Sequence, residues 1–131
     1  MATTEQAIAS VTYAANADLS AKQYFLVKRH TTAGQCALVA ATTDIPIGVL
    51  QNKPAAAGRA AEIVTLGRTK AEVAAATDIA IGDRLGPDAN GRLVKISTDK
   101  DLCCAIADEA ATAATGDRIT VTMISPMYLG V

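Results

Sequence analysis

The side chains that most often carry out chemistry are few in this sequence, and histidine is the scarcest of them. His30, in the segment KRHTTAG, is the only histidine in 131 residues. A single imidazole cannot build a multi-histidine metal site, and a Ser-His-Asp site is not easily assembled around it either. We therefore interpret His30 as a surface turn residue.

The cysteines are Cys36 and the adjacent pair Cys103 and Cys104. An odd number of cysteines argues against a disulfide framework. Successive side chains of a strand point to opposite faces, so Cys103 and Cys104 cannot converge on one metal ion from a regular strand. We interpret all three as small, partly buried apolar residues. A thiol nucleophile paired with His30 stays open as an alternative, although nothing in the spacing predicts it.

Carboxylates cluster in the second half of the chain, where they could in principle bind calcium through oxygen. The EF-hand spacing is absent, and most of these acids adjoin Gly, Asn, Thr or another charge, where Asp commonly bonds its own backbone. The acids are Asp78, Asp83, Asp88, Asp99, Asp101, Asp108, Glu109 and Asp117. We predict solvated turns, no metal site, no cofactor and no catalytic residues. Phosphate-binding and dinucleotide fingerprints are also missing.

Composition and charge narrow the class of protein. A chain of 131 residues is the size of one domain, and its 50% hydrophobic content includes 28 alanines and only four aromatic residues. The net charge is -1 with scattered Lys and Arg, so we expect no nucleic acid partner. No apolar stretch approaches the roughly 18 residues of a membrane span, and the N-terminus lacks the features of a signal peptide. We expect a protein that is made and kept in cytosol-like conditions, with no membrane partner.

Short apolar segments bounded by turn formers predict a mainly β domain, a small β-barrel or β-sandwich with little helix. Residues Met1 to Ser20 are rich in Ala, Thr and Ser, and we interpret them as an extended N-terminal arm. The remainder, 21–131, is then the β-rich domain. The expected strands are Tyr24–Arg29, Gln35–Ala40, Ile47–Asn52, Ala61–Gly67, Thr69–Ala74, Leu102–Ala107 and Arg118–Ile124.

Turn signals and internal similarity add detail to this fold. Asn90-Gly91 between two apolar segments predicts a hairpin with a type I′ turn. The segments Gly48–Leu66 and Ala105–Met123 both follow a strand, an Ala-rich loop ending in glycine, and a second strand. We expect two related half-barrels.

The order of these segments resembles that of phage capsid cement, or head decoration, proteins. An Ala/Thr-rich arm is followed by Thr-Ala-Gly-Gln-Cys entering a strand, then by IPIGVLQNKPAAAGRAAEIVTLGRTKAEVA and IAIGDRLGPDANGRLVKI. The family's "xGVxxxxxxAGxxxxVxxxG" and "xxGDxLxxxxxGxxxx" layouts are similar to residues 47–67 and 81–93. The resemblance covers about residues 21–124.

This resemblance implies a non-enzymatic protein of the virion. The family's members are β-rich, associate as a homotrimer on the outer surface of the head, and bridge neighbouring subunits of the major capsid protein. The expected function is adhesion that stabilises the expanded, DNA-filled shell, with no cofactor. Two alternatives stay open: another virion component such as a tail or spike protein, and a small-ligand-binding β-barrel with a pocket around His30 and a cysteine.

We expect the capsid contacts at both ends of the chain. In the arm, Ile8, Val11, Tyr13 and Leu19 are apolar groups on a polar tail, which is costly unless they dock; the alternative is packing on their own domain. Removing residues 1–20 should then abolish shell binding and leave the remainder folded. The C-terminal candidates for a trimer or capsid contact, or for a domain lid, are Met127, Tyr128, Leu129 and Val131.

Overall fold

The computed structural model describes residues 6–74, 78–96, 101–112 and 118–128, and all regular elements within these ranges are β-strands. This confirms the prediction of a mainly β fold. Nothing in the described ranges is a helix with the length and apolar character needed to cross a membrane. The strands are β1 (Gln6–Ala15), β2 (Leu26–Arg29), β3 (Gln35–Leu38), β4 (Pro46–Leu50), β5 (Ala60–Glu72), β6 (Arg84–Pro87), β7 (Leu93–Lys95), β8 (Leu102–Ala107) and β9 (Arg118–Tyr128).

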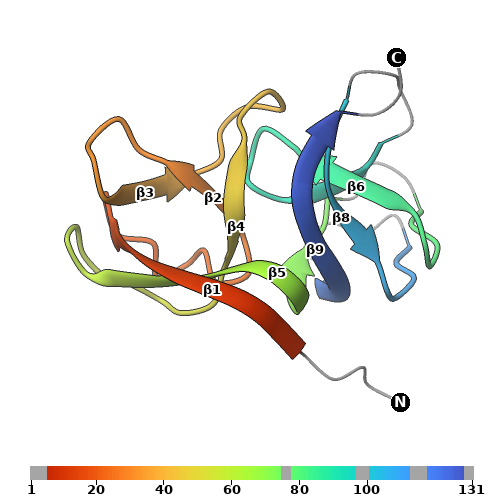
Figure 1. Ribbon diagram of the computed structural model, residues 1–131, viewed down its shortest axis with the longest axis horizontal. Helices are drawn as coiled ribbons and strands as arrows, with labels where there is room; N and C mark the ends of the chain where they lie inside the picture. Colours follow the sequence, from red (N-terminus) through yellow and green to blue (C-terminus); the bar gives the residue numbers. More distant parts are fainter. Residues whose placement is uncertain (1–5, 75–77, 97–100, 113–117, 129–131) are drawn as a thin grey trace.

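The strands form one mixed sheet with the order β1-β3-β2-β4-β5-β9-β8-β6-β7, folded into two halves (Figure 1). The N-terminal half contains β1 to β4 with the first part of β5, and the C-terminal half contains the end of β5 with β6 to β9. The order β3-β2-β4-β5 recurs as β7-β6-β8-β9, and β5 pairs antiparallel with β9 at the junction. The two Ala-rich segments are therefore the equivalent hairpins β4–β5 and β8–β9, as the sequence repeat predicted.

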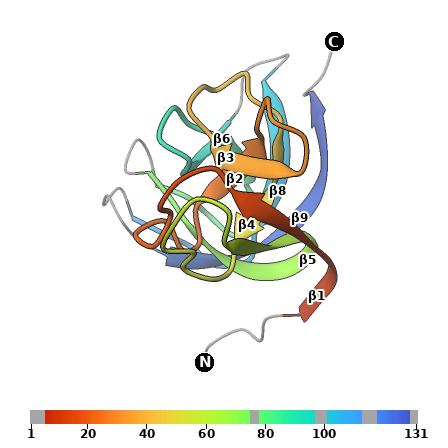
Figure 2. The same ribbon diagram turned by 90° about the vertical axis from the view of Figure 1, so that its left-hand side faces the viewer.

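The first strand closes the N-terminal half into a ring, which Figure 2 shows. β1 pairs antiparallel with β5, from Gln6 opposite Arg68 to Ala14 opposite Ala60, and its last two residues pair parallel with β3. The expected extended arm is not what the structure shows for this segment. Its Ala and Thr content suggested a polar tail, but its backbone groups are satisfied by two neighbouring strands. Whether residues 1–20 act as a separate unit stays a prediction.

The buried apolar residues form two clusters, and each contains cysteine. The larger one, called the C-terminal core, also includes Leu26, Val39 and Val49 from the N-terminal half. The end of β5 and the residues after it contribute Ala71 and Val73 to the C-terminal core. Val73 also forms an isolated β-bridge with Leu93 of β7. The N-terminal core consists of Ala15, Leu19, Val27, Cys36, Ile47, Leu50, Ala61 and Ile63. The C-terminal core contains Cys104 among Leu85, Leu93, Ala105, Ile119, Val121, Met123 and others. All three cysteines are free and fully buried, more so than the sequence indicated.

Two strands are longer than predicted. β5 runs without interruption through Gly67, where two separate strands were expected, and Gly67 has a φ of 101°. β9 continues past Pro126 to Tyr128, but its register against β8 shifts between Cys103 and Ala105. A proline has no backbone N–H to donate, which agrees with its position in the irregular part of the ladder. The strand thus continues four residues past Ile124, where it was expected to end.

The β6–β7 hairpin is confirmed, but the type I′ turn is wrong. Gly91 has a φ of 80°, whereas Asn90 is not among the described residues with positive φ, and a type I′ turn needs both. Five residues separate the strands, and Asp88 closes the loop by accepting hydrogen bonds at 2.8 Å from the backbone N–H groups of Asn90 and Arg92. The aspartate side chain therefore fixes this turn.

Candidate functional site

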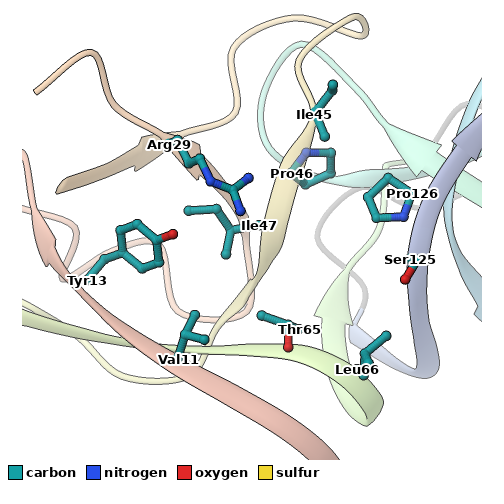
Figure 3. A pocket seen from close by; sticks show the side chains of 10 residues that line it. All are labelled: Val11, Tyr13, Arg29, Ile45, Pro46, Ile47, Thr65, Leu66, Ser125 and Pro126. Atoms are coloured by element: carbon teal, nitrogen blue, oxygen red, sulfur yellow. The ribbon is translucent and has the colours of Figure 1, made fainter. Parts of the chain in front are cut away.

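An open groove of about 310 Å³ lies where the two halves meet (Figure 3). Its walls come from β1, the start of β4, β5 and the late part of β9, with one side chain from the end of β2. Because these strands belong to both halves, the groove exists only when the halves are joined. The lining residues are Val11, Tyr13, Arg29, Ile45, Pro46, Ile47, Thr65, Leu66, Ser125 and Pro126.

The alternation of β1 sends its apolar side chains to the groove. Val11 and Tyr13 line it, whereas the intervening Thr12 lies on the opposite face and donates its hydroxyl to Glu62 Oε1 at 3.0 Å. In Figure 3 the Tyr13 hydroxyl and the Arg29 guanidinium point into the same space beside Ile47. The groove therefore combines apolar walls with two polar groups at one end.

A carboxylate holds the loop that forms the opposite rim. Asp44 Oδ2 accepts hydrogen bonds from Lys28 Nζ at 2.9 Å and from the backbone N–H groups of Ala40 at 2.9 Å and Ala41 at 3.0 Å. The hydrogen bond from Lys28 is the main reason that the pKa of Asp44 lies below its ordinary value. This network positions Ile45, whose side chain is 54% exposed. A second cavity, of about 450 Å³, shares Ile45 and Arg29 with the groove.

Exposed apolar side chains gather around this groove. In the described part of the chain, six large hydrophobic residues are exposed: Ile8, Val11, Ile45, Ile81, Met127 and Tyr128. Val11 and Ile45 line the groove, and three others lie on β1 or β9, which also contribute to it. Of these six residues, Ile81 is the one on a segment that does not contribute to the groove. Exposed apolar side chains in and beside a groove are typical of a protein-binding surface.

Comparison with known proteins identifies the class of molecule that carries this surface. Residues 3–123 match the family described as phage cement protein. The chain belongs to the phage cement protein family. The fold is similar to that of the head fiber gp8.5 N base of bacteriophage phi29, with a TM-score of 0.66, 21% identity, and coverage of 89% of this chain and 94% of that chain. The search of curated proteins gives no match.

Membership of this family makes the chain a capsid-associated structural protein of the virion. This confirms the resemblance to phage cement proteins that the order of the sequence segments indicated.

Of the four predicted contact residues near the N-terminus, three are available for binding. Ile8 is 81% exposed, and Val11 and Tyr13 line the groove. The predicted contact role of Leu19 is wrong, because this residue is only 5% exposed and belongs to the N-terminal core. For Leu19 the alternative interpretation, packing on its own domain, is the right one. The chain turns inward after β1, and Leu19 N–H donates to Pro54 O at 2.8 Å.

At the C-terminal end, Met127 and Tyr128 are exposed at the end of β9. A lid would bury them, so their exposure favours an intermolecular contact. Leu129 and Val131 lie outside the described residues. The sequence did not single out most of the groove, notably Arg29, Ile45 and Ser125. Val11 and Tyr13 are the two groove residues that the sequence did identify as contact candidates.

His30 of the cement protein lies in a turn, and its three cysteines are buried. His30 lies in the β2–β3 turn, where its Nδ1 accepts the Thr32 N–H at 3.1 Å, as the turn interpretation predicted. Burial, with a smaller contribution from Cys103, raises the pKa of the Cys104 thiol to about 12, which disfavours the nucleophilic thiolate. Among the residues that the structure describes, no three His, Cys, Asp or Glu side chains group as metal ligands.

Two of the acids predicted to bond their own backbone in turns do so. Asp83 Oδ2 accepts the Ala80 N–H at 2.8 Å, and Asp88 closes the β6–β7 loop. Asp108 is bound by side chains instead: its Oδ2 accepts the Thr122 hydroxyl at 2.6 Å and lies 3.4 Å from Arg68 Nε. Asp99 and Asp117 lie outside the described residues.

Proposed function

We propose that this cement protein docks through its groove face on the outer surface of the phage head. There it forms a homotrimer, bridges neighbouring subunits of the major capsid protein and stabilises the expanded, DNA-filled shell. The observation that supports this most directly is the gathering of exposed apolar residues on the groove and on the two strands beside it. Family membership supplies the capsid as the partner.

The physical basis is burial of apolar surface combined with repetition. Each square ångström of apolar surface removed from water contributes roughly 25 cal/mol, so covering Ile8, Val11 and Ile45 favours binding. A protein that binds only the expanded lattice stabilises that lattice by mass action. Linking three copies makes the second and third contacts intramolecular, so weak individual contacts give strong overall attachment.

The exposed end of β9 supports self-association as a separate contact. Met127 and Tyr128 follow directly after the groove residues Ser125 and Pro126 on the same strand. A trimer that used these side chains would place three grooves around one axis, each facing a different capsid subunit. Bridging then follows from the geometry of the trimer.

The test is to mix the purified protein with undecorated, expanded heads and to image the particles by cryo-electron microscopy. Added density at three-fold positions, with heads that resist heating better than bare ones, is the expected result. Bare shells would contradict the proposal. Imaging complete virions decides between the head and the alternative of a tail or spike component, because the protein's density must lie on the head.

A further inference from the structure

The polar groups of the groove are all hydrogen-bond donors or hydroxyls, and none is acidic. Its ten lining residues include one cation, Arg29, and no Asp or Glu. Of the three hydroxyl residues, Thr65 already donates to Ala9 O at 3.2 Å. Tyr13 and Ser125 remain. A groove of this composition is complementary to a ligand with a negative charge and apolar neighbours.

Arg29 is the charge in this groove that the protein itself leaves uncompensated. Asp44, which lines the second cavity together with Arg29, accepts hydrogen bonds from Lys28 and from two backbone N–H groups instead. Within the described ranges the guanidinium of Arg29 has no acidic, aromatic or hydrogen-bonding partner. It nevertheless points into the groove, beside Tyr13 (Figure 3). An arginine presents five donors in a planar fork that matches a carboxylate.

Exposed apolar groups lie on β1 both inside and outside the cavity. Val11 lines the cavity, and Ile8, which does not line it, is 81% exposed. A small ligand would fill the cavity but leave Ile8 in water. An extended peptide advances about 3.3 Å per residue and alternates its side chains, so it covers a long surface and still inserts one residue into the groove.

We infer that the groove binds an extended segment of the capsid partner whose Asp or Glu carboxylate pairs with Arg29. Apolar residues of the same segment cover Val11, Ile45 and Pro126. This inference rests on the proposed docking function and names the partner's chemistry. The carboxylate sets specificity, and the apolar neighbours supply affinity.

Charge variants test the inference on undecorated, expanded heads as the probe. Arg29→Glu is expected to weaken binding by at least about tenfold, and Arg29→Gln by a smaller factor with a reduced dependence on salt. The matched control is Arg84→Glu, because Arg84 is exposed at the start of β6 and lines neither of the two cavities. It should stay within about twofold of the unmodified protein. Equal binding of the Arg29→Glu and Arg84→Glu variants would overturn the inference.

A cross-linking experiment identifies the partner group directly. The Arg29→Lys variant on heads is treated with a carbodiimide, which joins an amine to a neighbouring carboxylate with loss of water. Mass spectrometry should find a cross-link from position 29 to an Asp or Glu of the major capsid protein, absent when Arg29→Gln is used. A cross-link to a second copy of this chain would overturn the inference and assign the groove to the trimer. If the unmodified protein fails to bind heads at all, the docking function fails first.

Discussion

Gly67 of β5 lies directly beneath the backbone of Ile8 in β1, so closely that a Cβ atom at position 67 would come within 2.5 Å of the Ile8 nitrogen. The same glycine pairs with Ala7 on one side and with Met123 of β9 on the other. Its φ of 101° also belongs to the region that favours glycine. At Gly67 and Arg68, β5 pairs with both β1 and β9 and so passes from the N-terminal half to the C-terminal half.

Gly67→Ala is therefore expected to lower the free energy of unfolding by at least about 2 kcal/mol, because it adds a backbone clash to an unfavourable φ. Urea unfolding measures the change. Gly58→Ala is the matched control: Gly58 has a similar φ of 88° but open space around it. It should cost only about 1 kcal/mol. Equal losses in the two variants would show that the close approach of β1 is not the cause.

A second prediction concerns Arg118, which joins β9 to the loop before β2. Its Nε lies 3.0 Å from Glu72 Oε1, and its guanidinium lies 5.1 Å from the centre of the Tyr24 ring. Glu72 is only 7% exposed, and its Oε2 has no hydrogen-bond partner. Arg118→Met keeps the aliphatic stem but leaves the carboxylate uncompensated, which should cost about 1–2 kcal/mol given that Arg118 is half-exposed.

The double variant checks the origin of that loss. Adding Glu72→Gln to Arg118→Met should restore most of the stability, since it removes the unpaired charge. Chemical unfolding of the two single variants and the double variant gives the coupling energy. If the losses of the single variants simply add, the ion pair contributes nothing.

The strands and the repeat were predictable because they depend on short segments. Alternation in RITVTMI and the turn formers around each segment identify β9 and its neighbours, and the matching Ala-rich loops identify the β4–β5 and β8–β9 hairpins. Such signals are local, so they can be recognised without knowing which strand pairs with the segment. The turn at Asn90 was predicted less well because Asp88, rather than the Asn-Gly pair alone, determines its shape.

The groove was not predictable because its walls are assembled by long-range pairing. Val11 meets Ile63 across the sheet, and Arg29 and Ile45 come together through the β2–β4 ladder. Nothing near Arg29 in the sequence shows that its guanidinium lacks a partner. Leu19 was misplaced for the same reason, since the core that buries it includes residues distant in the chain, such as Cys36 and Ile63. The composition of residues 1–20 indicated a polar arm, whereas the position of β1 depends on its pairing with β3 and β5.

Removal of residues 1–20 is now expected to destabilise the protein as well as to abolish binding. The deletion opens the N-terminal ring and takes Ala15 and Leu19 from its core. Thermal unfolding followed by circular dichroism should show a loss of cooperativity, which a synthetic peptide of residues 1–20 added in excess restores. A shortened chain that melts like the full one would contradict this role of β1.

Burial of Cys104 makes a prediction for alkaline pH. Its pKa is raised from 9.0 to about 12 in the folded protein. Below about pH 9 the thiol is protonated in both states, whereas between the two pKa values only the unfolded chain loses the proton, so the free energy of unfolding falls by up to about 1.4 kcal/mol per pH unit. Cys104→Ala lacks this contribution. Its stability deficit relative to the unmodified protein should therefore shrink by about 2 kcal/mol between about pH 8 and about pH 10.5. A constant deficit would contradict the assigned cause.

The apolar rim of the groove gives the most direct contrast between binding and folding. Ile45 and Ile81 are both exposed isoleucines, at 54% and 72%, but only Ile45 lines the groove. Ile45→Asp should weaken binding to expanded heads by at least about tenfold, since it places a charge where an apolar partner surface must be desolvated. Ile81→Asp should bind within about twofold of the unmodified protein. Because both side chains are exposed, neither variant should change the melting temperature by more than about 2 °C, which separates lost docking from lost folding. A larger binding defect in Ile81→Asp than in Ile45→Asp would move the docking surface to the other side of the C-terminal half.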